Sequence, residues 1–129
     1  MNDILNFSFT HEASIPEGQY AYTLTKVVPE MKVLTDNGIK DRIVFEFQLS
    51  ADGKLHKFTK KFNYSKHPRS FLMQFMSIVR DAYHMDNNIN LRELVNTKGV
   101  LTISHITDEH GNIYENITDM QAADDNKQQ

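Results

Sequence analysis

Residues 42–64 have the sequence RIVFEFQLSADGKLHKFTKKFNY, and the hydrophobic pattern of this stretch decides the fold. Apolar side chains occupy every odd position from Ile43 to Leu49, whereas the even positions are mostly polar. Such alternation is typical of a β-strand with one buried face. Asp52-Gly53 predicts a short hairpin turn, and a second alternating segment runs from Leu55 to Tyr64. Two antiparallel strands joined by a tight turn therefore form the centre of the predicted fold.

Working outward from this hairpin, the sequence predicts three more strands and one helix. The strands cover residues 19–25, 100–106 and 113–117, and a long loop up to residue 41 follows the first of them. Pro68 suits the first turn of a helix ending near His84, with Ser65 as a candidate cap. The apolar stripe of this helix comprises Phe71, Leu72, Phe75, Ile78, Val79 and Ala82.

Three strands, a helix and a closing hairpin is the element order of the OB-fold, a small Greek-key barrel. We therefore predict a mainly β protein, a five-stranded OB-fold Greek-key barrel with one α-helix between strands 3 and 4. The alternative built from the same elements is an α+β sandwich in which the helix covers one open sheet.

The chain has 129 residues, which predicts a single domain. We place this domain at residues 15–120, between a flexible N-terminal arm (1–14) and a disordered acidic C-terminal tail (121–129). No apolar run approaches the roughly 18 residues of a membrane span. No secretory signal is visible, and cysteine is absent. We therefore expect a cytoplasmic protein without thiol chemistry or a cysteine-bound metal.

Charge is distributed unevenly, although the net charge is only −3. Residues 54–80 hold seven basic side chains and no acidic one, whereas residues 108–129 hold six acidic side chains and one lysine. This asymmetry is typical of proteins that meet a polyanion with a basic patch. The alternative is that both segments are simply solvated.

Several segments together resemble a known family. They are residues 15–20 (IPEGQY), 38–47 (GIKDRIVFEF), 65–70 (SKHPRS) and the closing hairpin 108–117 (DEHGNIYENI). The chain is similar over residues 15–120 to the small OB-fold single-stranded-DNA-binding proteins of phages and conjugative plasmids of Gram-positive bacteria. The resemblance implies sequence-tolerant binding of single-stranded DNA in replication or transfer of a mobile element. The tail departs from that of the better-known bacterial single-strand binders, because it ends in polar residues instead of a hydrophobic tip.

Single-strand binding needs a basic groove for the phosphates and aromatic faces for the bases, and in an OB-fold the ligand lies over strands 2 and 3 and their bordering loops. The candidate DNA-binding residues are Lys32, Lys40, Arg42, Lys57, Phe58, Lys60, Lys61, Tyr64, Lys66, Arg69 and Tyr114. The alternative for the strand aromatics is a place in the barrel core, which we favour for Phe45 and Phe47. We expect the aromatics and methionines of the helix, Phe71 included, to pack against the barrel.

Other functions find less support in the sequence. It has no phosphate-binding Gly-Lys-Ser/Thr loop and no Gly-x-Ser-x-Gly elbow, so we expect neither an enzyme nor a cofactor. His105, His110 and Asp108 flank one hairpin loop without a further convincing ligand, so no metal site is expected. The alternative function is a non-enzymatic protein-interaction module of OB-like fold. The expected partners are single-stranded DNA, with RNA left open, and further copies of the chain through Ile4, Leu5, Phe7 and Phe9.

Overall fold

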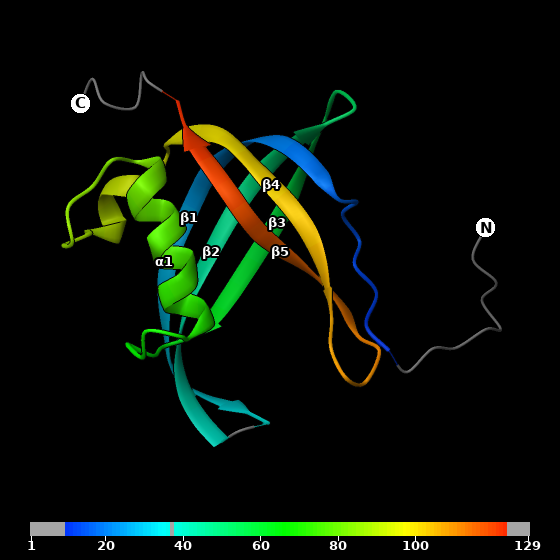
Figure 1. The fold of residues 1–129 in the computed structure, drawn as a ribbon, viewed down its shortest axis with the longest axis vertical. Coiled ribbons are helices and arrows are strands. Elements are labelled where there is room, and N and C mark those ends of the chain that lie inside the picture. Colours follow the sequence, from blue (N-terminus) through cyan, green and yellow to red (C-terminus); the bar gives the residue numbers. More distant parts are fainter. Residues whose placement is uncertain (1–9, 37, 124–129) are drawn as a thin grey trace, which may run out of the picture.

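The fold is mainly β, as a computed structural model of residues 10–36 and 38–123 shows (Figure 1). Over these described residues, five antiparallel strands form one sheet, and the α-helix lies between the third and fourth strands. The elements are β1 (Gly18–Thr35), β2 (Gly38–Ala51), β3 (Lys54–Asn63), α1 (Phe71–Ala82), the 3₁₀ turn η1 (Leu91–Leu94), β4 (Lys98–Thr107) and β5 (Ile113–Ala122). Among the described residues, no helix is both long and apolar enough to cross a membrane.

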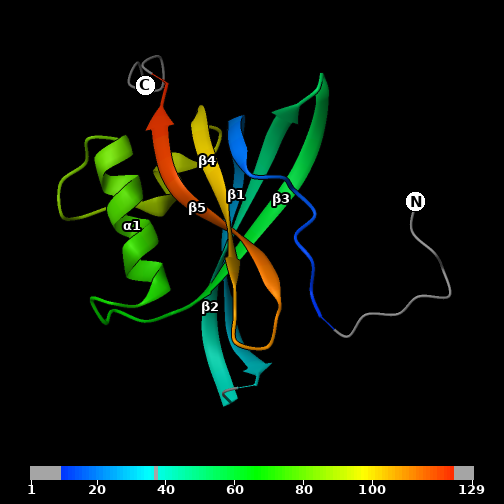
Figure 2. The same ribbon diagram turned by 45° about the vertical axis from the view of Figure 1, so that its right-hand side comes forward.

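The sheet is not closed into the predicted barrel. Its strand order is β3-β2-β1-β4-β5, so β3 and β5 are edge strands that do not pair with each other. Helix α1 packs against both edges, and its Phe75 stacks on Phe62 of β3 with ring centroids 5.0 Å apart. The helix therefore lies across the gap that pairing of the two edges would close. Figure 2 shows the twisted strands with α1 on one side of them.

The core is made by the alternating residues that the sequence pattern placed on one face. Phe47 of β2 lies opposite Phe58 of β3. The Phe45 ring packs edge-to-face against the Phe75 ring of α1, with ring centroids 4.9 Å apart. Phe45 and Phe47 are fully buried, as the preferred interpretation of these two residues requires. Burial of each such side chain contributes about 1.5–3 kcal/mol to the free energy of folding. A shift in the strand register would expose these side chains, so their burial fixes the register of the central strands.

The loop predicted after the first strand is instead a long β-hairpin. Strand β1 continues to Thr35, which pairs with Gly38 at the start of β2, and this hairpin extends below the rest of the sheet in Figure 1. Lys32 sits at an irregularity in the pairing with a left-handed φ of 56°. The prediction missed the extension because its apolar residues are exposed and its alternation stops at that irregularity.

The helix begins later than predicted. Ser70, rather than Ser65, is its N-cap, and the Ser70 hydroxyl accepts a hydrogen bond from the Met73 N–H at 3.2 Å. Leu72, Phe75 and Val79 form the buried stripe. Phe71 is the first helical residue and is 70% exposed, so its expected packing against the body is wrong.

Both predicted domain boundaries shift. Gln121 and Ala122, assigned to the tail, belong to β5 and lie opposite Val100 and Gly99 of β4. Residues 10–17, which we call the strap, lie against the β4–β5 hairpin: the His11 carbonyl accepts from the Ile113 N–H at 2.8 Å. The proposed association residues Ile4, Leu5, Phe7 and Phe9 and the end of the tail (124–129) lie outside the described residues.

Candidate functional site

Alternation along β3 separates the predicted binding residues onto two sides of the sheet. Phe58 faces inward, is buried, and stacks on Phe47 with centroids 6.1 Å apart. Its ring therefore belongs to the core and is not open to a nucleobase. Lys57 and Lys61 face outward and are exposed.

Lys60 lies on the inner side, at the gap between the two edge strands. Its Nζ donates a hydrogen bond to the Glu115 carbonyl of β5 at 2.8 Å and lies 5.7 Å from the centroid of the Phe62 ring. Burial lowers the pKa of the Lys60 amine, and the Glu115 carboxylate opposes this effect. Lys60 thus bridges β3 and β5 instead of lying on the outer surface beside Lys61.

Two of the predicted cations are paired with acids of neighbouring strands. Lys57 lies 3.4 Å from the Glu46 carboxylate, and Arg42 lies 2.7 Å from Glu30. A hydrogen bond from Thr25, together with Lys57, holds the pKa of Glu46 below its usual value. Lys57 and Arg42 are therefore compensated by acids of the neighbouring strands, which a count of acids along residues 54–80 does not reveal.

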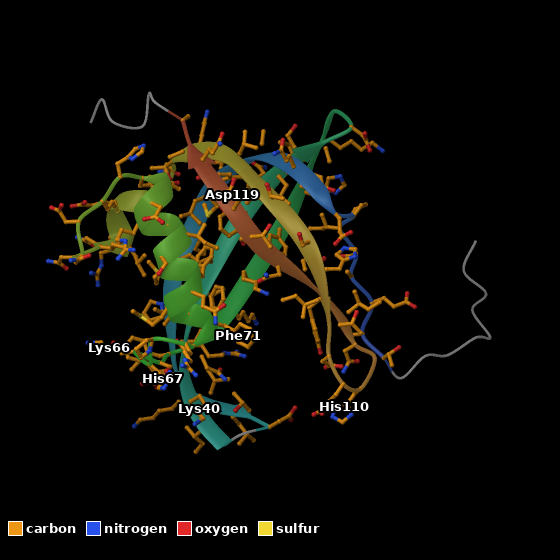
Figure 3. The ribbon with its side chains drawn as sticks, viewed as in Figure 1. Lys40, Lys66, His67, Phe71, His110 and Asp119 are labelled. Atoms are coloured by element: carbon orange, nitrogen blue, oxygen red, sulfur yellow. The ribbon has the colours of Figure 1, made fainter. Side chains whose placement is uncertain are left out.

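The remaining predicted cations gather at one end of the molecule. Lys32 and Lys40 lie in the β1–β2 hairpin, Lys61 near the end of β3, and Lys66 and Arg69 in the segment that leads to α1. None of the five is in an ion pair with another described residue. Figure 3 shows Lys40 and Lys66 at this end, with His67 and Phe71.

A cleft of about 770 Å³ opens beside these cations, between β3, α1 and β5. Buried apolar side chains of Phe62, Phe75 and Ile117 line its inner part. Lys61 and Arg42 line it from the basic end. The cleft exists because β3 and β5 are unpaired edges, so it is a direct result of the open sheet.

Two exposed aromatic rings line the cleft, Phe71 of α1 and Tyr114 of β5, which are 70% and 42% exposed. Tyr64 follows β3 and is 50% exposed, but it is not among the residues that line the cleft. Tyr114 is stacked on one face by His11 of the strap, at 4.6 Å and 15°. At most one face of the Tyr114 ring is therefore open to a ligand.

The strap is held in place by Glu115. The backbone N–H groups of Ser14 and Ile15 each donate to the Glu115 carboxylate at 3.1 Å. Burial raises the pKa of Glu115, but these bonds and that of its own N–H outweigh it, so the pKa is lowered. The same residue thus contacts Lys60 through its carbonyl and the strap through its carboxylate.

Phe71 is the residue that the sequence interpretation missed. A signal was present in the helical period, because Phe71 lies one position, about 100°, before Leu72 of the buried stripe wherever the helix begins.

Comparison with known proteins identifies no relative: no family model, no curated protein and no solved structure matches the chain.

Proposed function

We propose that the protein binds single-stranded DNA in the cytoplasm, without catalysis and without strong sequence preference, in replication or transfer of a mobile element. The observation that carries this proposal is that cations without ion-pair partners gather at one end of the molecule, beside a cleft that is lined by the exposed rings of Phe71 and Tyr114. Phosphate neutralisation and base stacking are the two requirements of single-strand binding.

The fold supports the same interpretation at a coarser level. Strand β1 is central and pairs with both β2 and β4, and the helix follows β3. We take this arrangement as an OB-like sheet left open between β3 and β5. In OB-folds the ligand lies beside the loops that follow strands 1 and 4, and here the β1–β2 and β4–β5 hairpins reach the same lower end in Figure 1.

Fluorescence anisotropy with labelled oligo-dT tests the proposal. Four cations near the cleft (Lys40, Lys61, Lys66 and Arg69) predict a plot of log affinity against log salt with a slope of roughly −3, at about 0.7 per phosphate. Duplex DNA of the same length should bind more weakly, because its stacked bases cannot reach the aromatic rings. A parallel titration with labelled oligo-rU shows whether the protein prefers DNA or RNA. Absence of binding to oligo-dT at 20 mM salt would refute the proposal.

A second candidate function is supported by the tip of the β1–β2 hairpin. Met31, Leu34 and Ile39 are 65%, 80% and 68% exposed, and Leu34 pairs directly with Ile39. Exposed aliphatic side chains in one place are typical of a protein-interaction surface. A protein that binds neither oligo-dT nor oligo-rU would favour this interaction module.

We also propose that copies associate through residues 4–9. Because residues 10–15 pack on the β4–β5 hairpin, the informative truncation removes residues 1–9 and keeps the strap. Light scattering with and without oligo-dT should then show a smaller mass for the truncated protein. Equal masses in both conditions would contradict this association.

A further inference from the structure

The cleft between β3, α1 and β5 has the properties of a pocket for a single nucleobase. Its volume of about 770 Å³ lies within the range of roughly 300–1,000 Å³ that is typical of small-molecule sites. Such sites combine an apolar lining with a few polar groups, and this cleft has buried Phe62, Phe75 and Ile117 inside and polar side chains nearer the solvent. A flat aromatic ring with a polar edge fits that combination.

Aromatic rings stand on two walls of the cleft. Phe71 comes from α1 and Tyr114 from β5. Phe71 is the most exposed aromatic ring of the described residues, although its neighbour Leu72 is buried. The open face of Tyr114 and the Phe71 ring are available for stacking on a base that enters between the edge strands.

Polar groups with unused hydrogen-bonding capacity line the same cleft. The side-chain amides of Asn63 and Asn116 bond to no other described residue. Lys60 has three N–H donors, and the Glu115 carbonyl takes one of them. A partly buried ammonium with free donors favours a ligand with a carbonyl oxygen.

Charge at the cleft favours an anionic ligand. Lys60 and Lys61 line it together with Arg42, which is already paired with Glu30, and Asp108 is the one acidic side chain among the lining residues. The Asp108 carboxylate already accepts hydrogen bonds from the backbone N–H groups of His110 and Asn112 at 2.9 Å. Lys61 is free to hold the phosphate that is attached to a bound nucleoside.

We propose that this cleft binds one unstacked nucleobase with an exocyclic carbonyl group, thymine being the simplest case, while the neighbouring phosphates lie on Lys61 and Lys66. This inference rests on the proposed function and deepens it: most of the strand is bound without preference, and one nucleotide is inserted. Phe71 stacks on the base and Lys60 donates to its carbonyl oxygen.

The test moves a single pyrrolocytosine, a fluorescent base that keeps a carbonyl oxygen, through successive positions of an oligo-dT that just fills the site. The pocket predicts a fluorescence response at one position that differs from all others, and Phe71→Ala should abolish that difference. Phe71→Ala should also weaken binding by roughly fivefold to a hundredfold, the worth of one stacked base. Leu55→Ala is the matched control, because Leu55 is 66% exposed at the far end of β3 and should change neither quantity.

Base preference is tested at the position so identified. A single adenine there should weaken binding to the parent protein, because adenine has no carbonyl oxygen, but should have little effect on Lys60→Met. Thermal melting establishes that each variant is folded. An equal pyrrolocytosine response at every position, with oligo-dT still bound, would overturn the pocket and leave the proposed function standing. Absence of oligo-dT binding would overturn both.

Competition by thymidine monophosphate shows whether the bound base belongs to a DNA strand or to a free nucleotide. If the cleft takes a base within a strand, the free nucleotide competes only at concentrations far above those of oligo-dT. If the nucleotide binds as tightly as the oligonucleotide, the cleft is a site for free nucleotides and the inserted-strand proposal is wrong.

Discussion

Two basic regions of this protein look alike in sequence but differ in the fold. Away from the cleft, Lys57 is paired with Glu46 of the adjacent strand β2. At the end beside the cleft, Lys61 has no ion-pair partner among the described residues. Lys57 and Lys61 stand four positions apart on the same face of β3. Strand pairing, and not the local density of lysine, decides which cations are available to a polyanion.

The largest expected effect comes from reversing charge at the end beside the cleft. Lys61→Glu with Lys66→Glu should weaken oligo-dT binding strongly and make the salt slope shallower by about 1.4, which corresponds to two phosphates. Lys54→Glu with Lys57→Glu is the matched control, because it reverses two charges at the other end of the same strand. Equal losses for the two double variants, measured by anisotropy, would erase the distinction between the regions.

Removal of Tyr64 should have the next largest effect. Its ring is half exposed and its N–H is fixed by the Asp41 carbonyl at 2.7 Å. Tyr64→Ala should reduce the binding free energy by about 1–3 kcal/mol through lost stacking. The salt slope should stay unchanged because no charge is altered. A shallower slope, or unchanged affinity in a folded variant, would show that Tyr64 does not act as a stacking platform.

Lys60→Met tests whether the gap between the edge strands is held by the Lys60 bridge. The variant keeps the side-chain length but removes a charge-assisted hydrogen bond to the Glu115 carbonyl, which contributes about 1.5–3 kcal/mol. Loss of the partly buried charge offsets part of this cost. We expect a net decrease in the free energy of unfolding of about 1 kcal/mol by urea denaturation. An increase would mean that burial of the ammonium outweighs its bond.

How far the sequence predicts this molecule is clear from particular residues. Alternation placed Phe45 and Phe47 in the core and assigned the helix to the interval between the third and fourth strands, because those patterns follow from local periodicity. The sequence left a closed barrel and an open sheet covered by the helix as alternatives and favoured the barrel, because the choice between them depends on how α1 sits between β3 and β5. The ion pairs of Lys57 and Arg42 were not predictable, because they depend on the register of three strands.

Glu46→Gln should have the smallest effect on oligo-dT affinity, because it changes only the ion pair with Lys57 on the outer face of the sheet. At neutral pH the Glu46 carboxylate holds Lys57, so its loss should free one cation and raise oligo-dT affinity slightly at low salt, with no change at high salt. The pH dependence has a definite sign. The pKa of Glu46 is lowered in the folded protein, so its contribution to stability is present above the unfolded pKa and is lost as pH falls through the folded pKa. Thermal melting between pH 3 and pH 6 should therefore show a slightly steeper acid loss in the parent than in Glu46→Gln, in which position 46 no longer titrates. A rise in affinity as large as the loss in the Lys61 and Lys66 variant would mean that the outer face binds DNA as well.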